Sequence, residues 1–98
     1  MADEHLYIVT YDIADDRRWR AVFKLMHGYG EWLQLSVFQC RLTRQRHIEL
    51  LGRLQQAVST ADDHVMIVDV GPADGVQPRV QTIGKRGFEP VARQPVIV

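Results

Sequence analysis

A carboxylate at the end of an apolar run is the residue of this chain best suited to chemistry. The segment from Tyr7 to Arg20 reads YIVTYDIADDRRWR, and Asp12 stands where its apolar, β-branched first half ends. Such a run predicts a strand that is buried on both faces. The strand would hold Asp12 rigidly, while the turn after it leaves the carboxylate oxygens open to solvent, metal or phosphate. The alternative is a turn residue that hydrogen-bonds to nearby backbone amides.

Asp12 has the chemistry needed for metal-assisted hydrolysis of a phosphodiester bond. That reaction needs an activated water and a cation that neutralises the charge developing on the phosphate, and Mg²⁺ supplies both. One Asp12 alone would make a poor metal site. Two copies related by a twofold axis would repel each other unless a cation lies between them. A metal site at Asp12 would therefore depend on a homodimer.

Basic residues follow Asp12 closely. The chain has 12 basic and 12 acidic residues, so its formal charge of zero gives no general attraction to nucleic acid. A local excess lies between Arg17 and Arg53, where eight basic residues stand against Glu31 and Glu49. Those in the first predicted helix, largely off its apolar stripe, are the candidate nucleic-acid-binding residues Arg17, Arg18, Arg20 and Lys24. The alternative is a solvated helix face without a ligand.

The elements that would position these residues can be placed from periodicity and capping signals. They are a strand over 5–12, a helix over 16–28, strand structure over 31–42, a helix from 43 to about 58, a strand over 64–70 and a short strand over 79–85. Asp15 or Asp16 would cap the first helix and Thr43 the second. Residues 31–42 fit either two short strands or one strand bent near Ser36. The buried side of the second helix is predicted to carry Ile48, Leu51, Leu54 and Val58.

This order predicts an α+β fold with a single domain over residues 1–98. It is the order of a ferredoxin-like βαββαβ sandwich, in which an antiparallel sheet carries both helices on one face. The tail at 88–98 contains Pro90 and Pro95, so we expect at most an extra C-terminal edge strand there. The sheet face opposite the helices would be apolar and uncovered, which in a small chain favours a partner.

Two motifs, in order and at a matching separation, resemble the CRISPR-associated Cas-two family. Tyr11-Asp12-Ile13 and the basic helix after it match one family pattern. The second strand region matches another through Gln34, Ser36, Val37, Phe38 and Cys40. The resemblance covers roughly residues 6–70 and implies the same ferredoxin-like fold, packed as a homodimer through its sheets. It also implies that the tail at 88–98 pairs with the sheet of the partner protomer.

The resemblance further implies a function in spacer acquisition. The protein would be a Mg²⁺-dependent endonuclease acting on single-stranded RNA or double-stranded DNA. It would also be the DNA-binding subunit that bridges two dimers of the Cas-one integrase. Asp12 would be both the catalytic and the metal-binding residue, with one Mg²⁺ shared by two protomers. Two alternatives remain open: a non-catalytic adaptor between integrase dimers, and a toxin-like endoribonuclease of the same fold.

Three residues are candidate auxiliaries to Asp12. Tyr11 would be a core residue whose hydroxyl could reach the site. Ser36 could donate to a phosphate or to Asp12, or could simply mark the bend of a strand. Phe38 could stack on an unpaired base, or could pack in the core or in a dimer interface.

Cysteine usage and the first residues of the chain bear on location. Cys40 is the only cysteine, so no disulfide can form within the chain, which fits a reducing cytoplasm. The N-terminal residues MADEHLYIVT contain neither a basic region nor a long apolar stretch. We therefore expect no signal peptide, no membrane contact and a cytoplasmic location.

Overall fold

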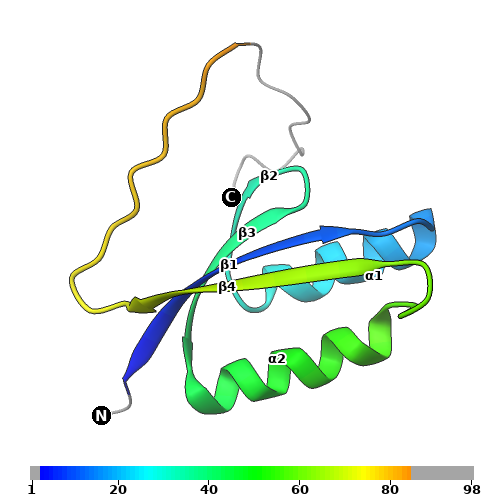
Figure 1. The fold of residues 1–98 in the computed structure, drawn as a ribbon, viewed down its shortest axis with the longest axis horizontal. Helices are drawn as coiled ribbons and strands as arrows, with labels where there is room; N and C mark the ends of the chain where they lie inside the picture. Colours follow the sequence, from blue (N-terminus) through cyan, green and yellow to red (C-terminus); the bar gives the residue numbers. More distant parts are fainter. Residues whose placement is uncertain (1–2, 85–98) are drawn as a thin grey trace.

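The computed structural model describes residues 3–84, which form one antiparallel sheet and two helices. The elements in chain order are β1 Glu4–Asp12, α1 Asp16–His27, β2 Glu31–Gln34, β3 Val37–Thr43, α2 Arg44–Ala57 and β4 His64–Pro72. The strand order in the sheet is β2-β3-β1-β4, and both helices lie on one face of it (Figure 1). This arrangement confirms the predicted α+β, ferredoxin-like fold. The predicted tail strand at 88–98 lies outside the described residues.

The hydrophobic core lies between the helices and the sheet. Strand side chains alternate between faces, and the core consists of Tyr7, Val9, Tyr11, Val22, Met26, Phe38, Cys40, Leu42, Leu50 and Leu54. On the opposite face of β1, Ile8 and Thr10 are half-buried. Only Leu6 is buried on that face of β1, at 1% exposure. The prediction that the strand is buried on both faces is therefore wrong for most of its length, because no helix or strand within residues 3–84 covers the open face.

Residues 31–42 form two strands rather than one bent strand. Leu35 and Ser36 connect β2 to β3, and Leu35 has a positive φ of 38°. A positive φ is unusual for a residue with a branched side chain and is typical of a tight turn. The turn settles the alternative that the sequence left open.

The second helix has the predicted ends but a different buried face. Thr43 caps it, with its hydroxyl oxygen accepting a hydrogen bond from Arg46 N at 3.2 Å. Its buried residues are Leu50 and Leu54, whereas Ile48 is 58% exposed and Leu51 37% exposed. The predicted stripe is therefore right for Leu54, and partly buried Val58 also packs against the core. It is wrong for Ile48 and Leu51, because Leu50 and Leu54, four positions apart, share the face turned to the core.

The chain after the second helix also departs from the expected pattern. β4 extends to Pro72, two residues past the predicted end, at the edge of the sheet where proline removes no internal hydrogen bond. Residues 79–84 contain no strand, so the predicted strand over 79–85 is wrong for its described part. No strand of the described chain pairs with this segment. Neither helix in residues 3–84 has the length and apolar character needed to cross a lipid bilayer.

Candidate functional site

Asp12 is the last residue of β1, and its side chain is exposed. It follows the buried Tyr11 and therefore points to the open face of the sheet. Its cross-strand partner in β4 is His64. Within residues 3–84 no hydrogen bond or ion pair holds the Asp12 carboxylate, so it is not the amide-bonded turn residue that was the alternative. An exposed carboxylate on a strand end offers hard oxygen ligands of the kind that Mg²⁺ prefers.

Residues 3–84 of one protomer contain no ready-made metal site. In the described part of the chain, no group of three or more His, Cys, Asp or Glu residues is arranged to hold a metal ion. The donor set therefore fits Mg²⁺ only if further ligands come from water, substrate or a second copy of the chain.

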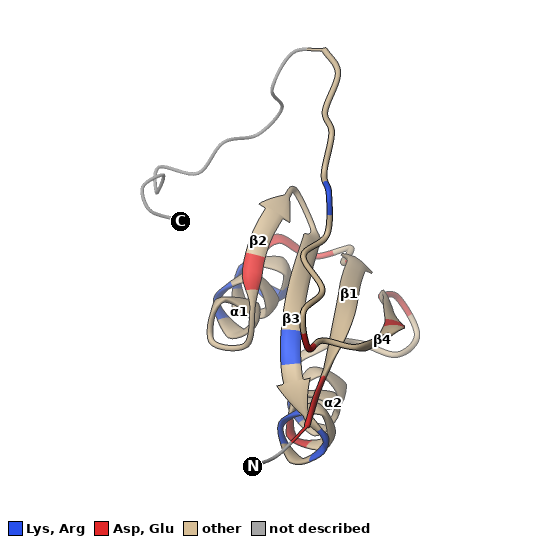
Figure 2. Ribbon diagram, turned by 90° about the vertical axis from the view of Figure 1, so that its left-hand side faces the viewer, with Lys and Arg blue, Asp and Glu red and all other residues tan. Residues whose placement is uncertain are grey.

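The four candidate phosphate contacts fall into two groups. Arg17, Arg20 and Lys24 are exposed and follow each other at steps of three and four residues, which places them in one row on α1. Figure 2 shows basic segments of α1 in blue. No described residue forms an ion pair with any of the three. We call these three residues the α1 basic row.

Arg18 lies outside that row and is engaged within the fold. Its Nε donates to Asp63 Oδ2 at 2.8 Å and its Nη2 donates to Asp63 Oδ1 at 3.2 Å. The Asp63 side chain is 0% exposed. Hydrogen bonding from the Arg18 guanidinium holds the pKa of Asp63 well below its usual range. No local signal in the sequence points to this pair, because Arg18 and Asp63 are 45 positions apart.

The auxiliary candidates Tyr11 and Ser36 are joined to the core rather than to Asp12. Ser36 Oγ accepts a hydrogen bond from Trp19 Nε1 at 3.0 Å, and Ser36 O accepts from Tyr11 N at 3.2 Å. Burial raises the pKa of the Tyr11 phenol, and the Ser36 side chain offsets part of that rise. Ser36 thus anchors α1 to the turn between β2 and β3. The donor for this anchor is the indole of Trp19 in α1.

Phe38 is fully buried, with 0% exposure. Its ring packs against Phe23 at a centroid distance of 5.7 Å and edge-on against His27 at 5.2 Å. A base could not reach either face of this ring without opening the core. Of the two roles considered for Phe38, the structure supports packing.

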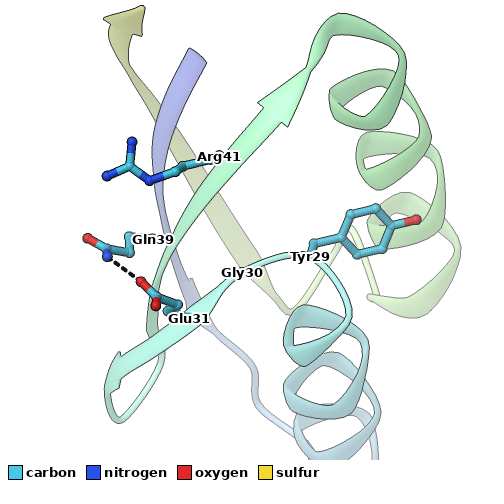
Figure 3. Close-up of a pocket in the computed structure, with 5 residues that line it drawn as sticks. All are labelled: Tyr29, Gly30, Glu31, Gln39 and Arg41. Carbon is cyan, nitrogen blue, oxygen red and sulfur yellow. Dashed lines mark hydrogen bonds between the residues drawn. The ribbon is translucent and has the colours of Figure 1, made fainter. Parts of the chain in front are cut away.

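A shallow pocket of about 240 Å³ lies at some distance from Asp12 along the sheet. It is lined by Tyr29, Gly30, Glu31, Gln39 and Arg41 (Figure 3). Gln39 Nε2 donates to Glu31 Oε1 at 2.6 Å, and Arg41 donates to the backbone oxygens of Ala73 and Val76. None of the predicted site residues lines it. The pocket is therefore separate from the candidate site around Asp12.

Comparison with known proteins identifies the family of the chain. Residues 5–74 match the family described as CRISPR associated protein Cas2. The chain is 59% identical over 95 residues to the CRISPR-associated endoribonuclease Cas2 of Geobacter sulfurreducens, and the alignment covers 97% of this chain and 99% of that protein. It is 50% identical over 95 residues to CRISPR-associated endoribonuclease Cas2 1 of Rhodospirillum rubrum, and that alignment covers 97% of this chain and 92% of the relative.

A solved structure supports the same assignment. The crystal structure of Streptococcus pyogenes Cas2 at pH 6.5 matches with a TM-score of 0.70 and 32% identity, covering 81% of this chain and 99% of that one. The family match includes Asp12, both helices and all four strands. The chain therefore belongs to the CRISPR-associated Cas2 family, the Cas-two family that its two motifs resemble.

Proposed function

We propose that this protein is a Mg²⁺-dependent endoribonuclease that acts as a homodimer, with one Asp12 from each protomer at the metal site. The observation that carries the proposal is the unpaired, exposed carboxylate of Asp12 at the end of a rigid strand. The Geobacter sulfurreducens and Rhodospirillum rubrum relatives, both named endoribonucleases, support the reaction class.

The positions of the side chains suggest a separate role for Asp12 and for the α1 basic row. When bound, Mg²⁺ activates water and offsets charge on the phosphate. The two Asp12 carboxylates would hold the ion, and hydrolysis would add water across one P–O bond of the RNA backbone, with the OH going to phosphorus and the H to the leaving oxygen. The α1 basic row binds neighbouring phosphates and holds the RNA strand in place at the site.

The open sheet face supports the proposed homodimer. Met66 and Val68 of β4 lie opposite Thr10 and Ile8 of β1, and are 50% and 46% exposed. They therefore share the face that also carries Asp12. Packing this apolar surface against a second copy would remove it from water and would bring the two Asp12 residues toward a common axis.

We also propose that the dimer binds DNA during spacer acquisition and bridges two dimers of the Cas-one integrase. The α1 basic row supports backbone binding, because Arg and Lys side chains neutralise phosphates without reading sequence. The same row would serve RNA and DNA.

The first test is a cleavage assay with the wild-type protein. We expect a labelled single-stranded RNA to be cut in Mg²⁺, to remain intact with EDTA, and to be cut again when Mg²⁺ is restored in excess. The same preparation should sediment as a dimer. Cleavage that continues in EDTA would overturn the metal dependence, and no cleavage under any of these conditions would overturn the nuclease function.

A second prediction concerns the α1 basic row. The slope of log K against log salt is about −0.7 for each phosphate neutralised in single-stranded nucleic acid. Replacing Arg17, Arg20 and Lys24 by Ala should therefore make the slope of RNA binding shallower by about 2 per protomer engaged. Arg53→Ala, an exposed arginine on α2, is the matched control and should leave the slope unchanged. Equal slopes for wild type and the triple variant would place the phosphate contacts elsewhere.

A further inference from the structure

The buried carboxylate of Asp63 gathers the chain segments around Asp12. Its Oδ1 accepts hydrogen bonds from Ala14 N at 2.9 Å and from Arg18 Nη2. Its Oδ2 accepts from Ser59 N at 2.8 Å and from Arg18 Nε. All four bonds converge on a side chain with no exposed surface. One residue thus joins the turn after β1, the first turn of α1 and the loop before β4.

These contacts reach Asp12 from both sides. Ala14 is two residues after Asp12 in the turn that connects β1 to α1. Asp63 itself immediately precedes His64, the cross-strand partner of Asp12. The end of β1, the turn and the start of β4 are therefore fixed relative to one another. The Asp12 carboxylate makes no hydrogen bond or ion pair within the described chain, so its place depends on this backbone.

We propose that Asp63 is a positioning residue for Asp12, and that it holds the turn at 13–15 so that the Asp12 oxygens keep one place on the open face. This inference rests on the proposed function, because a precise place matters only if Asp12 binds a shared ion. A displacement of about 1 Å at a reacting centre can cost about 100-fold in rate. Arg18 acts through Asp63, by neutralising a carboxylate that would otherwise be buried without a counter-ion.

Asp63→Asn is the informative substitution because it keeps the size of the side chain. The amide has one acceptor oxygen where the carboxylate has two. Its NH₂ group must therefore replace either the oxygen that accepts from Ala14 N and Arg18 Nη2 or the oxygen that accepts from Ser59 N and Arg18 Nε. We expect hydrogen exchange at the amides of Ala14 or Ser59 to accelerate about 10–100-fold, the range of a charge-assisted hydrogen bond. The ¹³C signal of the Asp12 carboxylate should shift or broaden.

The catalytic readout should separate positioning from general stability. For Asp63→Asn we expect kcat to fall about 10–100-fold, as when a supporting partner of a metal ligand is lost, with KM for RNA unchanged. Asp62→Asn removes a neighbouring exposed charge that accepts only a 3.3 Å bond from Ser59 Oγ, and should behave as wild type. Leu42→Ala weakens the core at the end of β3 that lies away from Asp12. When the assay temperature is well below the Tm of this variant, its kcat should equal that of wild type.

The outcomes are distinguishable. A fall in kcat for Asp63→Asn with neither control affected supports the inference, whereas an equal fall for Leu42→Ala would show that Asp63 acts only through stability. A wild-type protein without nuclease activity would overturn the proposed function. The inference would then be decided by the exchange rates and the Asp12 signal, and unchanged values of both would overturn it.

Discussion

Asp12→Asn is expected to abolish RNA cleavage while leaving the protomer folded. The substitution keeps the shape of the side chain and removes the negative charge that would hold a cation. We expect a loss of about 100-fold or more in kcat, the scale seen when one charge-stabilising group of an active site is removed. The side chain is exposed and forms no hydrogen bond or ion pair within residues 3–84, so the stability change should stay within about 0.5 kcal/mol. Thermal unfolding and a single-turnover cleavage assay measure the two quantities.

A mixing experiment tests whether the two protomers share the ion. Wild-type and Asp12→Asn chains with different tags are combined under conditions that allow subunit exchange. If both carboxylates are required, activity should fall with the square of the wild-type fraction, because only wild-type dimers cleave. If each protomer has a complete site, activity should fall in proportion to that fraction. The linear result would contradict the shared site.

Asp16→Asn is the matched control for both experiments. Asp16 is also exposed and acidic and lies four residues along the chain, in the first turn of α1. It should retain cleavage, with at most the small stability loss that accompanies removal of an acid from a helix N-terminus. Equal losses for Asp12→Asn and Asp16→Asn would show that the effect reflects local charge rather than a site at Asp12.

The place of Asp12 could be predicted because its determinants are local. An apolar run ends at Asp12, and Asp15 caps α1 three residues later, accepting from Arg18 N at 2.9 Å. Thr43 marks the start of α2 in the same way. These signals lie within a few residues of the feature that they specify, so strand, turn and helix follow directly from the sequence.

The surroundings of Asp12 could not be predicted, because they depend on pairs that are distant in the chain. Arg18 and Asp63 are 45 positions apart, and nothing in the sequence distinguishes Arg18 from Arg17 or Arg20 until the loop before β4 is placed. The buried face of α2 was predicted only in part, for a related reason. Ile48 and Leu51 are as apolar as Leu50 and Leu54, and only packing against the sheet decides which pair is covered.

Phe38 shows how burial decides between two roles of an aromatic residue. A phenylalanine on a predicted strand near Asp12 is compatible with stacking on a base or with packing. The structure places its ring among Tyr11, Phe23 and His27 with no exposed surface. Its contribution should therefore be to stability, and any effect of its removal on RNA binding should follow from unfolding.

Phe38→Ala is expected to produce the largest loss of stability of any single substitution considered. Truncating a buried phenylalanine costs about 3–5 kcal/mol, from lost burial and from the cavity that remains. The free energy of unfolding of a whole domain is about 5–15 kcal/mol, so the variant should unfold at a much lower denaturant concentration than wild type. Phe38→Leu keeps most of the volume and should lose much less. A base-stacking role predicts the opposite pattern: Phe38→Ala would then remain as stable as wild type and lose RNA affinity at low temperature, and that result would contradict the packing role.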